Sequence, residues 1–190
     1  MDVLHPAKPR VVRTWGICVI FSELCTTSNF TFLRGASHPE ELVTRAADLG
    51  LSAIAITDHN SLAGVVRAYA ALKELRRNMD EITIRSTKRV DPSSREVLQG
   101  QDITLHGDHL PKLIIGARLI LEDSDVDWVA LPRDRTAYEA LSRLLTLGKR
   151  RSEKGSCQLY YTDVLEGAQG MILIALPRTL EQEASAHIRQ

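Results

Sequence analysis

The sequence predicts an α/β fold, with a mainly parallel sheet or barrel covered by helices. Short apolar runs rich in Ile and Val alternate along the chain with amphipathic segments, which is the pattern of successive βα units. The run at 53–57 is apolar on both faces, as expected of a strand that is buried on both sides. The same alternation returns after residue 112, so one sheet system is expected to use both halves of the chain.

The first half predicts two strand–helix pairs. Pro39 suits the first turn of a helix that Ser37 or His38 caps, Glu40 and Glu41 suit its positive end, and Gly50 ends it. Leu42, Val43, Ala46, Ala47 and Leu49 are expected to form its buried face. The expected elements, in order, are a strand over 16–25, a loop over 26–35, a helix over 39–49, a strand over 53–57 and a helix over about 61–75.

The second half predicts further strands and one long helix. These are strands over 113–121, 128–131 and 171–176, and a helix over 135–147 with Tyr138, Leu141, Leu144 and Leu145 facing inward. Between them, residues 76–112 are charged and Ser-rich, with short β-like pieces at 82–84 and 103–105. Connections this long are uncommon inside a domain, so the segment is interpreted as a surface insertion. The predicted organisation is a loose leader over 1–12 and one domain over 13–190.

Composition is that of a globular protein without a strong global charge. Of 190 residues, 44% are hydrophobic and 25% are charged, and 24 basic residues balance 24 acidic ones, so no overall field attracts DNA or an anionic membrane. Cys18, Cys25 and Cys157 show no CxxC spacing, which favours a reducing compartment and predicts a cytoplasmic protein. The apolar windows are too short to cross a membrane.

Asp58 and His59 are the first candidate functional residues. They follow the buried strand at 53–57, at the strand end where α/β and barrel folds place their chemistry. An Asp-His pair is half of a metal site, because each divalent ion takes four to six ligands. A purely structural interpretation is also open: Asp58 caps the next helix or binds loop amides, and His59 packs.

Four segments resemble a known family: residues 35–42, 55–69, 114–119 and 144–155. They are similar to the polymerase and histidinol phosphatase (PHP) domain at the N-terminus of error-prone bacterial DNA polymerases, C-family enzymes related to the replicative polymerase III alpha subunit. The resemblance covers roughly 16–75 and 112–177. It implies a distorted βα barrel of PHP type, with metals at the strand ends in phosphoesterase members. It also implies an incomplete barrel with an apolar edge, and a fragment that stops before the palm, thumb and fingers.

The resemblance also implies that the metal site has degenerated. The positions matching the family's ligands carry Cys25, Thr27, Arg34 and Arg118, and 125–128 contains no His. Arginine is cationic and donates hydrogen bonds only, so it repels metals instead of ligating them. His59 and Asp58 are thus expected to be vestiges, with no catalytic residue and no cofactor in this chain. Arg34 and Arg118 are expected to pair with Asp58 or nearby Glu residues.

A basic cluster ends the helix at 135–147. Lys149, Arg150, Arg151 and Lys154 could contact a nucleic-acid backbone, or could simply be cations favoured at a helix C-terminus. The His-x-x-His spacing at 106–109 is expected to lie in a solvated loop, because Gly107 interrupts any helix there.

The functional hypothesis is a structural PHP module of an error-prone polymerase, which copies DNA during damage-induced translesion synthesis. The parent enzyme would use Mg²⁺, and the partners would be the remainder of the polymerase chain, DNA through that enzyme, and other mutagenesis or replication proteins. One alternative is a stand-alone PHP phosphoesterase or 3′–5′ exonuclease that uses Zn²⁺ or Mn²⁺ at His59 and Asp58. Another is a degenerate remnant that folds poorly.

Overall fold

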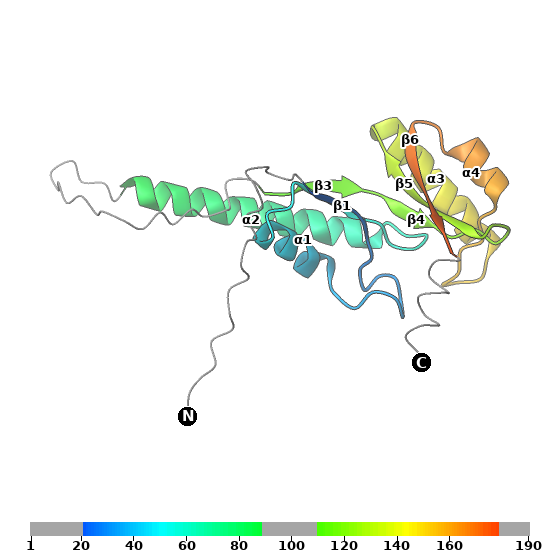
Figure 1. Ribbon diagram of the computed structural model, residues 1–190, viewed down its shortest axis with the longest axis horizontal. Helices are drawn as coiled ribbons and strands as arrows, with labels where there is room; N and C mark the ends of the chain where they lie inside the picture. The colour runs from blue at the N-terminus through cyan, green and yellow to red at the C-terminus, as the bar shows by residue number, and fades with distance from the viewer. Residues whose placement is uncertain (1–20, 89–109, 179–190) are drawn as a thin grey trace, which may run out of the picture.

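The six strands and four helices of the described chain alternate along its length (Figure 1). The structure is a computed structural model and describes residues 21–88 and 110–178. The elements are β1 (Ser22–Thr26), α1 (Pro39–Asp48), β2 (Ala53–Ile56), α2 (Ala63–Lys88), β3 (Lys112–Ile115), β4 (Ala117–Leu119), β5 (Val126–Pro132), α3 (Arg135–Arg151), α4 (Tyr161–Gly167) and β6 (Met171–Pro177). The predicted α/β class is confirmed.

The strands form two three-stranded sheets of opposite character. The sheet β1-β2-β3 is parallel, whereas β4-β5-β6 is antiparallel. The prediction of a mainly parallel sheet is therefore wrong for the second half. Only residues 120–125 join β4 to β5, and a parallel pair needs a crossover of a dozen residues or more. So short a link makes the two strands antiparallel.

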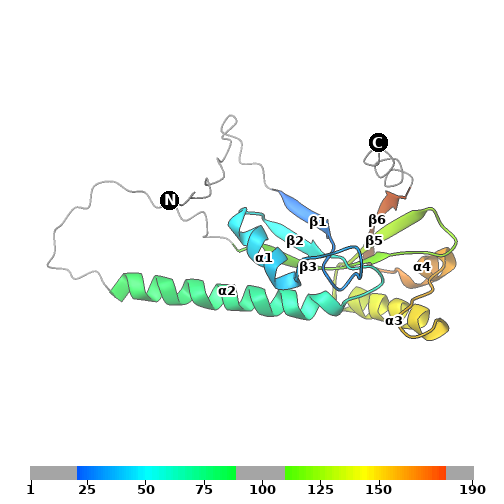
Figure 2. The ribbon, with the colours of Figure 1, turned by 90° about the horizontal axis from the view of Figure 1, so that it is seen from below.

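The two sheets face each other, and helices cover their outer faces. In β2, Ile54 and Ile56 pack with α1 and α2, while Ala55 packs with Val129 and Leu131 of β5. A third cluster packs α3 and α4 against the second sheet: Ala117, Leu119, Leu121, Ala130, Leu141, Leu144, Leu145, Leu159 and Val164. Figure 2 shows α2 along one side of the first sheet. This order of layers is that of an open, flattened βα barrel.

The chain passes from the first sheet to the second at Gly116, so the strand predicted over 113–121 is divided into β3 and β4. A Cβ at Gly116 would lie 2.6 Å from Leu131 Cδ2 and 3.0 Å from Thr57 Cγ2, so a side chain does not fit at this crossing. Beside it, a single parallel bridge between His59 and Arg118 links the end of β2 to β4. The two sheets therefore meet at the Asp58-His59 segment.

The ends of α1 agree with the prediction. His38 is the N-cap, and the Glu41 carboxylate accepts a hydrogen bond of 2.9 Å from its backbone N–H. Gly50 follows the helix with φ of +68°, which glycine adopts without strain. The buried face is narrower than predicted: Val43 and Ala46 are buried, whereas Leu49 is 54% exposed.

Helix α2 extends beyond its predicted end, into the segment 76–112 that the sequence predicts to be a surface insertion. The helix continues to Lys88, so residues 76–88 belong to a helix and the β-like piece at 82–84 is helical. Figures 1 and 2 both show α2 extending past the sheets. Residues 89–109, which include the pieces at 103–105 and 106–109, lie outside the described residues, as does the predicted leader over 1–12.

The helices of the second half also differ from the prediction. Helix α3 continues to Arg151, four residues beyond its predicted end. Tyr138 was predicted to face inward but is 39% exposed, and the neighbouring Ala137 is buried instead. Helix α4 was not predicted. Its N-terminus is defined by Asp163, whose carboxylate accepts a 2.9 Å hydrogen bond from the backbone N–H of Tyr160. Within the described ranges, no helix is long and apolar enough to cross a membrane.

Candidate functional site

Asp58 lies at the carboxyl end of β2 and binds the loop that follows β1. It is 1% exposed, and its carboxylate accepts three hydrogen bonds of 2.8 Å: from the backbone N–H of Ser28 to Oδ1, from Ser28 Oγ to Oδ2, and from Thr31 Oγ1 to Oδ1. These neutral donors satisfy most of the accepting capacity of a carboxylate. Asp58 thus binds a loop amide, as the structural interpretation expected.

Helix α2 approaches Asp58 closely from the other side. A Cβ at Gly64 would lie 2.6 Å from Asp58 Oδ2 and 3.1 Å from Ser28 Oγ. Glycine therefore allows the first turn of α2 to touch the carboxylate. The same contact fills space that a ligand of Oδ2 would need.

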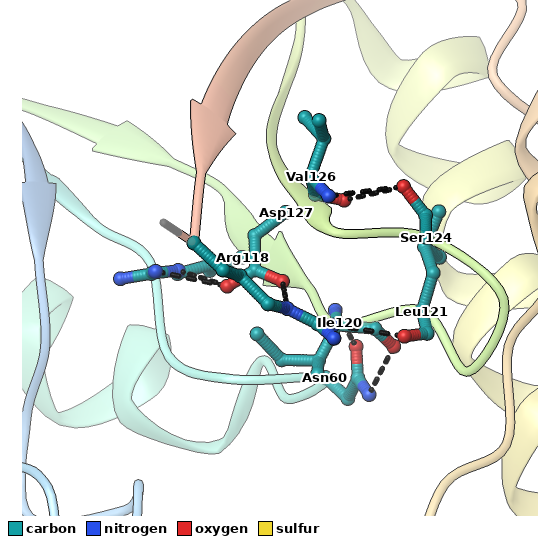
Figure 3. A network of polar contacts seen from close by, with 8 residues as sticks. Asn60, Arg118, Ile120, Leu121, Ser124, Val126 and Asp127 are labelled. Carbon is teal, nitrogen blue, oxygen red and sulfur yellow. Dashed lines mark hydrogen bonds and ion pairs between the residues drawn. The ribbon is translucent and has the colours of Figure 1, made fainter. Parts of the chain in front are cut away.

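His59 binds the loop after β1, and Asn60 links the end of β2 to the second sheet. The backbone N–H of His59 donates to Thr31 Oγ1 at 3.0 Å, and the His59 side chain is half-buried at the wall of a pocket. Asn60 has φ of +46°, a left-handed conformation that Asn tolerates better than most residues. Its side chain accepts from Ile120 N–H at 2.9 Å and donates to Ile120 O at 3.2 Å (Figure 3). The sequence analysis missed this role, although a polar residue after the Asp-His pair was a signal for it.

Arg118 pairs with Asp127, a residue that the sequence analysis did not select. The two side chains point toward each other (Figure 3). Arg118 Nη2 and Nε lie 2.8 and 3.0 Å from Asp127 Oδ2, and the two side chains are 10% and 4% exposed. Arg178, just after β6, places Nε 2.6 Å from Asp127 Oδ1 and donates from Nη2 to Leu121 O at 2.8 Å. Among the described contacts, Arg118 therefore pairs with Asp127, whereas the Asp58 carboxylate is bound by Ser28 and Thr31. The signal that could have identified Asp127 is an acidic residue inside the apolar strand β5.

The donor set does not fit a metal cluster of the PHP type. In residues 21–88 and 110–178, no group of three or more His, Cys, Asp and Glu side chains could hold a metal ion. The Asp58 oxygens accept three protein hydrogen bonds, and a guanidinium lies at Arg118. Of the other positions that the family resemblance gives to metal ligands, Cys25 and Arg34 are exposed and Thr27 is half-buried. The expected ion pair of Arg34 with Asp58 is not found.

The basic cluster does not form one surface. Arg151 makes a bidentate ion pair with Asp163, with Nη1–Oδ2 of 2.5 Å and Nη2–Oδ1 of 2.9 Å, and this hydrogen bonding lowers the pKa of the Asp163 carboxyl. Arg150 lines a groove on α3 together with Arg143. Lys149 and Lys154 instead line the pocket that contains His59. Only these two lysines lie beside the Asp-His segment.

The pocket beside His59 has a volume of about 550 Å³ and lies between the loop after β1, the start of α2 and the end of α3. Ten residues line it: Phe30, His59, Asn60, Ser61, Lys149, Glu153, Lys154, Gly155, Ser156 and Cys157. Burial raises the pKa of the Cys157 thiol, so this side chain is neutral near pH 7. With two lysines, one glutamate and a neutral thiol among its lining residues, the pocket is more basic than acidic.

Comparison with known proteins places this site in a family context. A protein of Ruegeria pomeroyi named error-prone DNA polymerase is 63% identical over 173 residues, covering 90% of this chain and 16% of its own length. Proteins of the same name from Rhodopseudomonas palustris and Bradyrhizobium diazoefficiens are 41% and 42% identical, covering 83% and 85% of this chain. The chain spans only 11% and 12% of those two relatives.

A solved structure and a family match complete the comparison. A protein of Bifidobacterium adolescentis described as a proposed metal-dependent phosphoesterase is 20% identical, with a TM-score of 0.42 over 69% of this chain and 34% of its own. A TM-score below 0.5 adds nothing to the assignment. The PHP domain family, in contrast, matches residues 23–187, which include both sheets and the whole Asp58–Arg118 region. The chain therefore belongs to the PHP domain family.

Proposed function

We propose that this PHP domain is a non-catalytic structural module of an error-prone DNA polymerase. Its relatives named error-prone DNA polymerase are six or more times longer than the matched region, since that region spans 16% or less of each. DNA-directed DNA synthesis in damage-induced translesion repair, with Mg²⁺, would belong to the remainder of that polymerase. The partners would be that remainder, DNA through it, and other mutagenesis or replication proteins, in the cytoplasm.

The observation that carries the non-catalytic assignment is the buried pair of Arg118 and Asp127. A metal-dependent phosphoesterase brings several carboxylates and imidazoles together so that metal ions polarise phosphate and activate water. Here Arg118 occupies a position where the family resemblance places a metal ligand, and its guanidinium is already paired with the Asp127 carboxylate. A divalent cation at this position would meet a buried positive charge, which is strongly unfavourable in a low-dielectric environment.

A structural module also needs a surface that contacts its neighbour. Phe32 and Leu33 are 85% and 87% exposed, at the tip of the loop that Asp58 holds, and Leu33 has φ of +62°. Apolar side chains in a strained, anchored loop are typical of a contact surface, not of a solvated loop. We assign this loop to contact with the remainder of the polymerase chain. In the full-length protein, the double substitution Phe32→Ser with Leu33→Ser should make the domain more sensitive to limited proteolysis. The control substitution Leu165→Ser should not, although Leu165 is also an exposed apolar residue, at 64%.

The test of the polymerase assignment is the coding sequence on both sides of this chain. A continuous reading frame with palm-type carboxylates after residue 190, and a full-length product that extends a primer in Mg²⁺, are expected. A complete gene without such a region would contradict the assignment.

The alternative of a stand-alone phosphoesterase or 3′–5′ exonuclease is favoured by one observation, namely that His59 lines an open pocket. It predicts hydrolysis of p-nitrophenyl phosphate or of 3′-labelled single-stranded DNA with Zn²⁺ or Mn²⁺. We expect no hydrolysis above that of the His59→Ala variant. Hydrolysis that His59→Ala abolishes would overturn the structural assignment.

A further inference from the structure

We propose that the pocket between His59 and the end of α3 binds a nucleotide unit without a metal, with its phosphate held by Lys149 and Lys154. The ligand is a nucleoside phosphate, either free or within a single DNA strand. The inference goes beyond the structural role and does not depend on the polymerase assignment, because it concerns binding by this chain alone.

The charges of the pocket favour an anion. In the described part of the chain, neither Lys149 nor Lys154 takes part in an ion pair, in contrast to Arg151, which Asp163 neutralises. Glu153 is the single carboxylate among the lining residues. Two ammonium groups against one carboxylate leave a positive pocket that suits the charge of a phosphate.

The start of α2 adds neutral donors at the same pocket. Ser61 lines the pocket two residues before this 26-residue helix, and Ser61 Oγ accepts from the backbone N–H of Ala63 at 3.2 Å, which leaves its hydroxyl proton available to donate. Ser156 is a second hydroxyl residue among those that line the pocket.

Phe30 distinguishes a nucleotide from a bare phosphate. Its ring is 40% exposed at the wall of the pocket, and the Arg67 guanidinium lies 6.0 Å from the ring centroid. An exposed aromatic ring beside a basic groove is the arrangement with which proteins stack single-stranded bases. A volume of about 550 Å³ lies in the range of pockets that hold small ligands.

The same helix provides a matched control. Arg143 and Arg150 are also exposed and basic, but they line a different groove on α3 that does not contain His59. Removing both arginines changes the net charge by the same two units as removing both lysines. An attraction that depends on net charge alone would respond equally to the two changes, although Arg143 is ion-paired with Glu139.

The experiment measures binding of a 5′-fluorescent oligo-dT strand to the 190-residue chain by anisotropy, in EDTA and at low salt. Lys149→Gln with Lys154→Gln should weaken binding about tenfold or more, because two phosphate contacts are lost. Arg143→Gln with Arg150→Gln should change it less than about twofold. Phe30→Ala should weaken binding of the strand but not of inorganic phosphate measured by competition. Thermal unfolding of each variant confirms that it is folded.

Unlabelled thymidine monophosphate distinguishes the two sources of the nucleotide. If thymidine monophosphate displaces the labelled strand and the lysine substitutions abolish this displacement, the ligand is a free nucleotide. If thymidine monophosphate does not displace the strand, but the lysine substitutions still weaken strand binding, the ligand is a DNA strand. Equal losses in the two double variants, binding that requires an added metal, or no binding of the strand at low salt would each overturn the proposal. The polymerase assignment would survive all three results.

Discussion

Two buried carboxylates at the junction of the sheets, Asp58 and Asp127, are held in different ways. Asp58 is 1% exposed and is satisfied by neutral groups, one backbone N–H and two hydroxyls. Asp127 is 3% exposed and is paired with the guanidinium groups of Arg118 and Arg178. The first organises one loop, whereas the second joins β4, β5 and the end of β6.

The difference shows two ways in which protein groups satisfy a buried carboxylate at this junction. Metal clusters hold neighbouring carboxylates together by supplying positive charge between them. Here Arg118 supplies that charge to Asp127, and the loop after β1 supplies hydrogen-bond donors to Asp58. The two carboxylates therefore have separate partners, and substitutions at them should have separate and unequal effects.

The largest effect is expected for Asp127→Ala. This change leaves two guanidinium groups without their carboxylate, one of them buried, and loss of one partner of a buried pair costs about 3–5 kcal/mol. Urea unfolding at neutral pH measures the loss. The double variant Arg118→Met with Asp127→Leu should recover most of it, because the buried guanidinium is removed together with the Asp127 carboxylate. A loss below about 1 kcal/mol in Asp127→Ala would show that the network contributes little.

A smaller loss is expected for Asp58→Ala. It leaves the backbone N–H of Ser28 and two buried hydroxyls without an acceptor, at a cost of about 2–3 kcal/mol after local rearrangement. Asp134→Ala is a matched control, because exposed Asp134 accepts one 2.8 Å hydrogen bond from Ala137 N–H at the start of α3. That cap is worth about 1 kcal/mol. Equal losses in the two variants would contradict the assigned role of Asp58.

The smallest effect concerns Asp163, in α4. Its pKa lies below its ordinary value because of hydrogen bonding to Arg151, so its contribution to stability is present above the unfolded pKa and is lost as the pH falls through the folded value. Arg151→Gln should raise the pKa of Asp163 and flatten the acid side of the stability profile. NMR titration of the carboxyl measures the shift. The neighbouring Arg150→Gln should leave this pKa unchanged, and an equal shift there would contradict the pairing.

The sequence located some of these features and not others. Asp58 and His59 were predicted at the end of a buried strand, because a run apolar on both faces followed by polar residues is a strong local signal. The pairing of Arg118 with Asp127 depends on the antiparallel register of β4 and β5, which no local pattern encodes. The short link over 120–125 was the available clue to that register.

The division of the basic cluster was predictable in principle. Lys149, Arg150 and Arg151 are consecutive, and consecutive residues on a helix point about 100° apart, so they could not share one face. The sequence analysis ended the helix at residue 147 and therefore treated them as one cluster at the C-terminus of that helix. The position of Lys154 beside His59 could not be predicted from the sequence, because it depends on how the chain after α3 folds back to the pocket that His59 lines.

The most direct test of the account measures metal content and stability together. Its central claim is that protein ion pairs and hydrogen bonds, not metals, stabilise the junction of the two sheets around Asp58 and Asp127. Elemental analysis of the purified chain should find far less than one equivalent of zinc, manganese or iron, and the unfolding temperature should be the same with EDTA as with added Zn²⁺ or Mn²⁺. A bound metal stabilises the folded state by mass action, so two or more equivalents with a lower unfolding temperature in EDTA would contradict the claim.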